Sequence, residues 1–309
     1  MMKTAIQLAA LCCALLLNSA GEAAINRQEM RQSVRQYAAT LDNSAWSVKT
    51  STALRCELVH AIPQFGEARF VSTASKESNL LFQLKMQRQP DGYSLAEVLS
   101  IPPGWRAGEQ AKALADMKLL KQFDGDLPKQ QAWTMLTELE QGFSPTFYFD
   151  DWHSPYDKIA AQLNPIHFGL PYQQFNACMA GLLRFTFDDI ALTVLNYQSN
   201  SDALTRESEA RLQQIAEYLK HDKAIASVDI DTYTDSYGGR WINEELSRKR
   251  AKALKAFLVS AGIDEKVIRT EGFGEKRHVA PNDTLRGRAT NRRAVVQLVR
   301  AEAPRLTIQ

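Results

Sequence analysis

Residues 231–243 carry the chain from an alternating segment into a helical one, and they read Asp231-Thr232-Tyr233-Thr234-Asp235-Ser236-Tyr237-Gly238-Gly239-Arg240-Trp241-Ile242-Asn243. Before this stretch, apolar and polar residues alternate over 226–231, which is the period of a half-buried strand. After it, apolar residues recur at helical spacing over 242–260, and Gly262 stands just beyond. The stretch is therefore predicted to be a polar loop that joins a strand to a long helix.

The segments around this loop complete a small α/β unit. A helix is expected to begin at Thr205, and further strands are expected over 185–194, 267–271 and 294–299. The resulting order is β-α-β-α-β-β. We expect its helices to pack on one face of a mixed sheet, as an α/β sandwich of about 110–120 residues.

Three separated motifs in this half carry a family resemblance. They are Thr234-Asp235, then Asn243 with Leu246-Ser247-Arg248-Lys249-Arg250-Ala251, and finally Asn291-Arg292-Arg293. In this order they resemble the peptidoglycan-binding domain of the OmpA family, over roughly residues 185–302. The fifteen-residue step from Asp235 to Arg250 also agrees with the family spacing.

The resemblance implies a binding site for the diaminopimelate of a peptidoglycan stem peptide. Its side chain ends in an ammonium and a carboxylate on one carbon, so the pocket needs one charge of each sign. Asp235 is expected to accept the ammonium, and Arg250 to hold the carboxylate by paired hydrogen bonds. The residues expected to assist them are Thr234, Asn243, Arg292 and Arg293. Without the resemblance, Arg250 would read as part of a solvated helix face and Asp235 as a turn residue.

The first 24 residues are predicted to be a secretory signal peptide. Lys3 precedes an apolar run over residues 5–17, and small residues follow where a signal peptidase cuts, between Ala20 and Ala24. The apolar run is shorter than a membrane span needs, although a membrane anchor remains the alternative. The mature chain is therefore expected to reach the periplasm.

Removal of the leader leaves two cysteines, Cys56 and Cys178. In an oxidising compartment an even number of cysteines predicts a disulfide, and two buried free thiols are the alternative. The bridge would close a loop of 122 residues.

Residues 25–180 show mostly short strand-like periods. Strands are expected over 55–60, 68–73, 80–87, 134–139 and 146–149, and a helix near 108–122. The predicted fold class is α+β. A mostly-β N-terminal domain over 25–184, either a barrel or a sandwich, precedes the OmpA-like βαβαββ domain over 185–309.

The composition excludes several functional classes. The 309 residues carry a net charge of +2, which gives no reason to expect nucleic acid as a partner. The five histidines lack metal-ligand spacing, and no catalytic constellation, metal site or cofactor motif is recognised. Asp150-Asp151 is the nearest acid–base candidate, but adjacent residues on a strand point to opposite faces.

The whole mature chain has a second resemblance. Two cysteines at this separation, an aromatic segment over 143–152 and a junction over 172–178 precede the OmpA-like module. This arrangement resembles the family of T-ring proteins of sodium-driven polar flagellar motors. The resemblance implies a non-catalytic periplasmic protein at the flagellar basal body. Its implied partners are peptidoglycan, a MotX-like protein, the basal body and the stator complex.

Two alternatives remain for the function. One is a general peptidoglycan-anchored envelope protein unrelated to the flagellum. The other is a periplasmic enzyme whose β domain acts on wall polymer.

Overall fold

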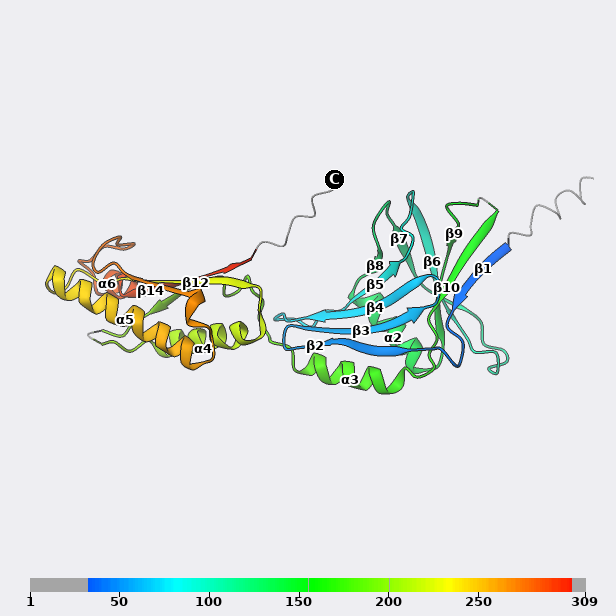
Figure 1. The fold of residues 1–309 in the computed structure, drawn as a ribbon, viewed down its shortest axis with the longest axis horizontal. Coiled ribbons are helices and arrows are strands. Elements are labelled where there is room, and N and C mark those ends of the chain that lie inside the picture. Colours follow the sequence, from blue (N-terminus) through cyan, green and yellow to red (C-terminus); the bar gives the residue numbers. More distant parts are fainter. Residues whose placement is uncertain (1–32, 155, 200, 302–309) are drawn as a thin grey trace, which may run out of the picture. The chain divides into compact units, whose positions relative to one another are not determined.

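The computed structural model describes residues 33–154, 156–199 and 201–301, which form two compact units (Figure 1). The first unit contains residues 33–51, Cys56–Ser72 and Asn79–Ala177. The second contains Thr52–Arg55, Thr73–Ser78 and the described chain from Cys178 onward. The expected signal peptide lies outside the described residues.

The first unit is built on two five-stranded sheets, in the orders β1-β10-β9-β6-β7 and β2-β3-β4-β5-β8. Their strands are β1 (Ser33–Ala38), β2 (Trp46–Ser51), β3 (Arg55–Ile62), β4 (Gly66–Thr73), β5 (Leu81–Met86), β6 (Ser94–Ile101), β7 (Lys112–Leu119), β8 (Gly125–Leu127), β9 (Ser144–Asp150) and β10 (Asp157–Gln162). The sheets meet where Phe82 of β5 stacks on Phe147 of β9, with ring centroids 5.3 Å apart. Neither sheet closes into a barrel, so the sandwich is the correct one of the two expected forms.

Two helices accompany these sheets, α2 (Lys129–Glu140) and α3 (Gly169–Ala180). The sequence reading was wrong in this region, because it expected a strand over 134–139 and a helix near 108–122. Residues Ala132, Met135, Leu136 and Leu139 are buried at helical spacing, which makes α2 a helix. In β7, Met117 and Leu119 are buried on either side of an exposed residue, which is strand spacing.

His60 of β3 is a buried titratable group in this unit. Its ring stacks on Trp46 with centroids 4.4 Å apart. Its Nδ1 lies 3.1 Å from the Ala45 carbonyl oxygen, and its Nε2 accepts from the Asn164 amide at 3.2 Å. A neutral ring with its proton on Nδ1 satisfies both contacts. Burial lowers the pKa of His60 to about 4.

This pKa predicts that the first unit loses stability as the pH falls from 7 to 4. The unfolded chain protonates His60 near its ordinary pKa of 6.5, whereas the folded chain resists until about pH 4. Between these values the unfolded state binds more protons than the folded state. The free energy of unfolding therefore decreases as the pH is lowered, by about 3 kcal/mol in all. Thermal unfolding of the wild type and His60→Phe over this range checks it. The variant should start lower but show a flatter pH profile, and equal slopes would contradict the assignment.

The second unit is a four-stranded mixed sheet, β11-β14-β12-β13, in which only β12 and β13 are parallel. Its elements are β11 (Leu192–Asn196), α4 (Arg206–His221), β12 (Ile225–Thr232), α5 (Arg240–Ser260), the 3-10 helix η1 (Glu265–Val267), β13 (Ile268–Gly272), α6 (Leu285–Asn291) and β14 (Arg293–Arg300). Side chains of α4 and α5 share one core with Val228, Ile230 and Val296 of the sheet. The expected α/β sandwich is thus observed, with the short helix α6 in addition.

Two local features of this sheet concern the start of β11 and the contact of β13 with α5. The first strand begins at Leu192 rather than near residue 185, because Asp189 accepts from the backbone and hydroxyl of Thr186 and forms a turn there. At the other side of the sheet, Gly272 lets α5 approach closely. A Cβ at Gly272 would lie 2.5 Å from the backbone nitrogen of Arg248 on α5.

The structure contains the disulfide expected between Cys56 of β3 and Cys178 of α3. Among the described helices, none combines the length and the apolar character that a membrane crossing needs.

Candidate functional site

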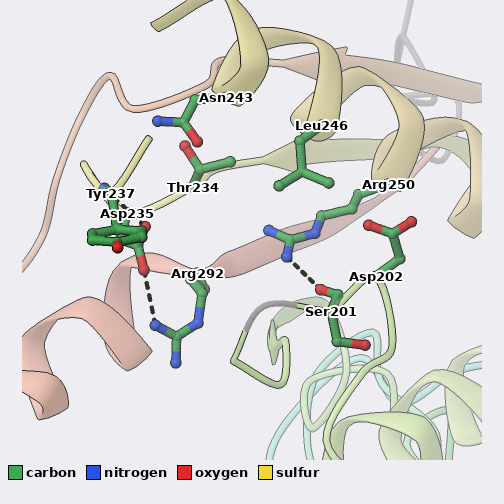
Figure 2. Close-up of a pocket in the computed structure, with 9 residues that line it drawn as sticks. All are labelled: Ser201, Asp202, Thr234, Asp235, Tyr237, Asn243, Leu246, Arg250 and Arg292. Atoms are coloured by element: carbon green, nitrogen blue, oxygen red, sulfur yellow. Dashed lines mark hydrogen bonds and ion pairs between the residues drawn. The ribbon is translucent and has the colours of Figure 1, made fainter. Parts of the chain in front are cut away.

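A pocket of about 580 Å³ lies in the second unit, where β12 ends and α5 begins (Figure 2). It is lined by Ser201, Asp202, Thr234, Asp235, Tyr237, Asn243, Leu246, Arg250 and Arg292. Five of the six residues expected to bind peptidoglycan therefore lie on one pocket. Arg293 is the one that does not line it.

The secondary structure explains how distant residues reach this pocket. Thr234, Asp235 and Tyr237 lie in the loop between β12 and α5. Asn243 and Arg250 are seven residues apart on α5, so they lie on the same face of the helix. Arg292 stands between α6 and β14.

The side chain of Asp235 accepts hydrogen bonds from two donors. Its Oδ2 accepts from Arg292 Nη1 at 2.8 Å, and its Oδ1 accepts from the Tyr237 amide at 3.1 Å. The side chains of Asp235 and Arg292 are 11% and 14% exposed, so both are largely shielded but still reach the pocket. A carboxylate oxygen can accept more than one hydrogen bond, so Asp235 keeps capacity for a further donor.

Arg250 enters the pocket from α5 and is incompletely bonded. Its guanidinium lies 4.1 Å from the centre of the Tyr197 ring, and its Nη2 donates to the Ser201 carbonyl oxygen at 2.6 Å. Its Nε and Nη1 are buried and have no hydrogen-bond partner among the described residues. Burial lowers the pKa of Arg250. Unmade hydrogen bonds on a buried charge are costly, and the described residues leave part of the hydrogen-bonding capacity of Arg250 unused.

The charges that line the pocket balance. Figure 2 shows the Asp235–Arg292 pair on one side and the Arg250 guanidinium on the other. Together with Asp202 they supply two carboxylates and two guanidinium groups. Such a lining suits a ligand that carries both signs of charge better than a simple anion or cation. Polar groups of Thr234 and Arg292 that lack partners among the described residues, Oγ1 and Nε, add to this capacity.

Hydrogen bonds beneath the pocket fix the loop against α5. Thr232 donates from its hydroxyl to the Ser247 carbonyl oxygen at 2.6 Å. The Ser247 hydroxyl accepts from the Gly274 amide at 2.9 Å, and the Gly274 carbonyl accepts from the Thr234 amide at 2.8 Å. Of the Leu-Ser pair in the sequence motif, Leu246 therefore lines the pocket and Ser247 supports the loop beneath it.

The Asn-Arg-Arg block divides its roles in the same way. Asn291 is fully buried and accepts from the amides of Val279 and Ala280, which holds the loop before α6. The Arg293 guanidinium lies over the Tyr233 ring at 4.1 Å, and its Nη2 donates to the Arg277 carbonyl oxygen at 3.0 Å. Arg293 therefore braces the fold, and Arg292 is the member that lines the pocket.

Four lining residues were not among the site residues expected from the sequence. Leu246 stands in the quoted motif, four residues before Arg250, and this helical spacing was a usable signal. Tyr237 lies two residues beyond Asp235 in the same loop. Ser201 and Asp202 come from the connection between β11 and α4. No local sequence pattern predicts that this connection lies beside α5.

The adjacent carboxylates considered from the sequence, Asp150 and Asp151, lie in different surroundings. Asp151 is buried just after β9, and its Oδ2 lies 3.2 Å from Arg35 Nη1. Asp150 is exposed. In the part of the chain that the structure describes, no three His, Cys, Asp or Glu side chains gather as metal ligands would.

Comparison with known proteins gives a family match for each half of the chain. Residues 37–184 match the MotY N-terminal domain family, and residues 196–292 match the OmpA family. The sodium-type flagellar protein MotY of Vibrio parahaemolyticus is 42% identical over 268 residues, which cover 87% of this chain and 92% of that protein.

Two further proteins match only in part. The probable lipoprotein YiaD of Escherichia coli is 36% identical over 114 residues, which cover 36% of this chain and 52% of YiaD. The peptidoglycan-associated lipoprotein from Burkholderia pseudomallei has a solved structure with 27% identity and a TM-score of 0.32. That match covers 34% of this chain and 89% of the lipoprotein.

Proposed function

Because this chain belongs to the MotY family, we propose that it is a non-catalytic periplasmic component of a flagellar motor. In this role it forms part of the T ring at the basal body and links stator recruitment to peptidoglycan. The first unit meets the basal body and a MotX-like partner and helps to recruit the stator complex, and the second unit holds the assembly to the wall. The match to a sodium-type flagellar protein covers most of both chains, and it supports the motor context.

The wall contact takes place in the pocket beside α5. The zwitterion at the end of a diaminopimelate side chain places its ammonium at Asp235 and its carboxylate at the unpartnered N–H groups of Arg250. Arg292 holds Asp235 in place, while Thr234 and Asn243 complete the polar lining.

One observation carries this assignment. Arg250 is 2% exposed, yet two of its nitrogens lack a hydrogen-bond partner among the described residues, and the pocket that it lines has balanced charges. A buried guanidinium that only stabilised the fold would be expected to have its donors satisfied. A ligand carboxylate satisfies them, and the ligand's ammonium completes the balance at Asp235.

Deleting the gene in its native host tests the motor role. The cells should still carry assembled flagella but should fail to swim, and the wild-type chain supplied in trans should restore swimming. A mutant that swims normally but has a leaky envelope would contradict the motor role and would favour a general envelope anchor.

A further inference from the structure

A second hollow of about 310 Å³ adjoins the charged pocket and is shaped by α4 and α5. It is lined by Tyr197, Asp202, Leu204, Glu209, Leu212, Gln213, Arg250, Ala253, Leu254 and Phe257. Asp202 and Arg250 line both spaces. The two spaces therefore adjoin at the Arg250 side chain.

The character of this hollow differs from that of the charged pocket. Half of its lining is apolar, and the leucines at 204, 212 and 254 are all largely buried. Such a surface suits a small aliphatic group that carries a polar group beside it, because charged and polar side chains make up much of the remaining lining.

The Tyr197 hydroxyl is the polar group of interest in this hollow. Tyr197 is 3% exposed, and its Oη is buried without a hydrogen-bond partner among the described residues. Burial raises the pKa of Tyr197, so the hydroxyl stays protonated and can donate. A phenylalanine would stack on Arg250 equally well without burying an unbonded hydroxyl. The hydroxyl therefore points to an acceptor supplied from outside the chain.

We propose that this hollow is a second subsite, which binds the alanine-sized residue that follows diaminopimelate in the same stem peptide. The proposal rests on the function proposed above. Only three methylene groups separate the zwitterion of diaminopimelate from the peptide backbone, so the backbone can follow Arg250 from one space to the other. The methyl group of the residue packs against Leu254 and Leu212, and a carbonyl or carboxylate oxygen of the same residue accepts from Tyr197 Oη.

Calorimetric titration of the full chain with two probes tests the subsite. The probes are the tripeptide L-Ala-γ-D-Glu-meso-diaminopimelate and the tetrapeptide that carries one further D-alanine. The wild type should bind the tetrapeptide about 10-fold more tightly, as one well-made hydrogen bond and a buried methyl group allow. In Tyr197→Phe this ratio of affinities should fall toward one, and the melting temperature should not decrease.

A second pair of variants tests the hollow without changing Tyr197. Ala253 is an exposed residue of α5 that lines the hollow, so Ala253→Phe should fill it and also bring the ratio toward one. Ala256 is exposed on the same helix and lies outside this lining, so Ala256→Phe should keep the wild-type ratio.

The outcomes separate the two proposals. Equal binding of both peptides by the wild type, or an unchanged ratio in Tyr197→Phe and Ala253→Phe, would overturn the second subsite alone. Failure of the wild type to bind either peptide would overturn the proposed wall-binding function together with it.

Discussion

Asp235→Asn is expected to weaken binding of the full chain to purified peptidoglycan sacculi by at least about 30-fold. The amide keeps the shape of the side chain but removes the negative charge that the ligand ammonium needs. It also leaves Arg292, whose side chain is 14% exposed, without its carboxylate partner at 2.8 Å. Removing one member of a buried charged pair at a binding site costs about 2–5 kcal/mol, which sets this lower limit. Co-sedimentation over a range of sacculus concentrations measures the effect.

Asp229→Asn is the matched control for this variant. Asp229 belongs to β12, six residues before Asp235, and it pairs with the exposed Arg269 at 3.5 Å instead of lining the pocket. The control should sediment as the wild type does. Retention of wild-type affinity by Asp235→Asn, with the far-ultraviolet circular dichroism of both variants unchanged, would remove Asp235 from the site.

Replacing both Cys56 and Cys178 by serine is expected to lower the free energy of unfolding by about 4–5 kcal/mol. The disulfide closes a loop of 122 residues, and the chain-entropy relation gives a value of this size for such a loop. A loss of this order is a large fraction of the stability of an ordinary domain, so the variant should also be depleted in the periplasm. Urea unfolding of the purified variant and the wild type measures the difference.

Reduction of the wild type provides the control for the disulfide. Wild type treated with a reductant should unfold at the same urea concentration as the double-serine variant, whereas the reductant should leave that variant unchanged. Equal stability of the oxidised wild type and the variant would contradict a structural role for the bridge.

The C-terminal architecture could be predicted from the sequence because its signals are local. Thr205 caps α4 by accepting from the Ser208 amide, and the alternation around Val228 and Ile230 becomes β12. In the N-terminal half the same approach failed at α2 and β7. There, short apolar runs fit both periods, and the tertiary packing around Met117 and Met135 decides between them.

The candidate site could be predicted only where its residues share a motif. Asp235, Asn243 and Arg250 lie within one loop and helix, and the structure brings them to one pocket. The pairing of Asp235 with Arg292 and the contribution of Ser201 and Asp202 depend on how distant segments fold together. Whether Arg292 or Arg293 turns toward the pocket depends on where β14 begins, because adjacent residues on a strand face opposite sides.

Titration of the wild-type chain with two stem tripeptides, one ending in meso-diaminopimelate and the other in L-lysine, compares ligands that differ by a single side-chain carboxylate. If Arg250 receives that carboxylate while Asp235 holds the ammonium, the diaminopimelate peptide should bind saturably and the lysine peptide at least about 10-fold more weakly. Equal affinity for the two peptides, or no saturable binding of the first, would contradict recognition of a zwitterion in this pocket.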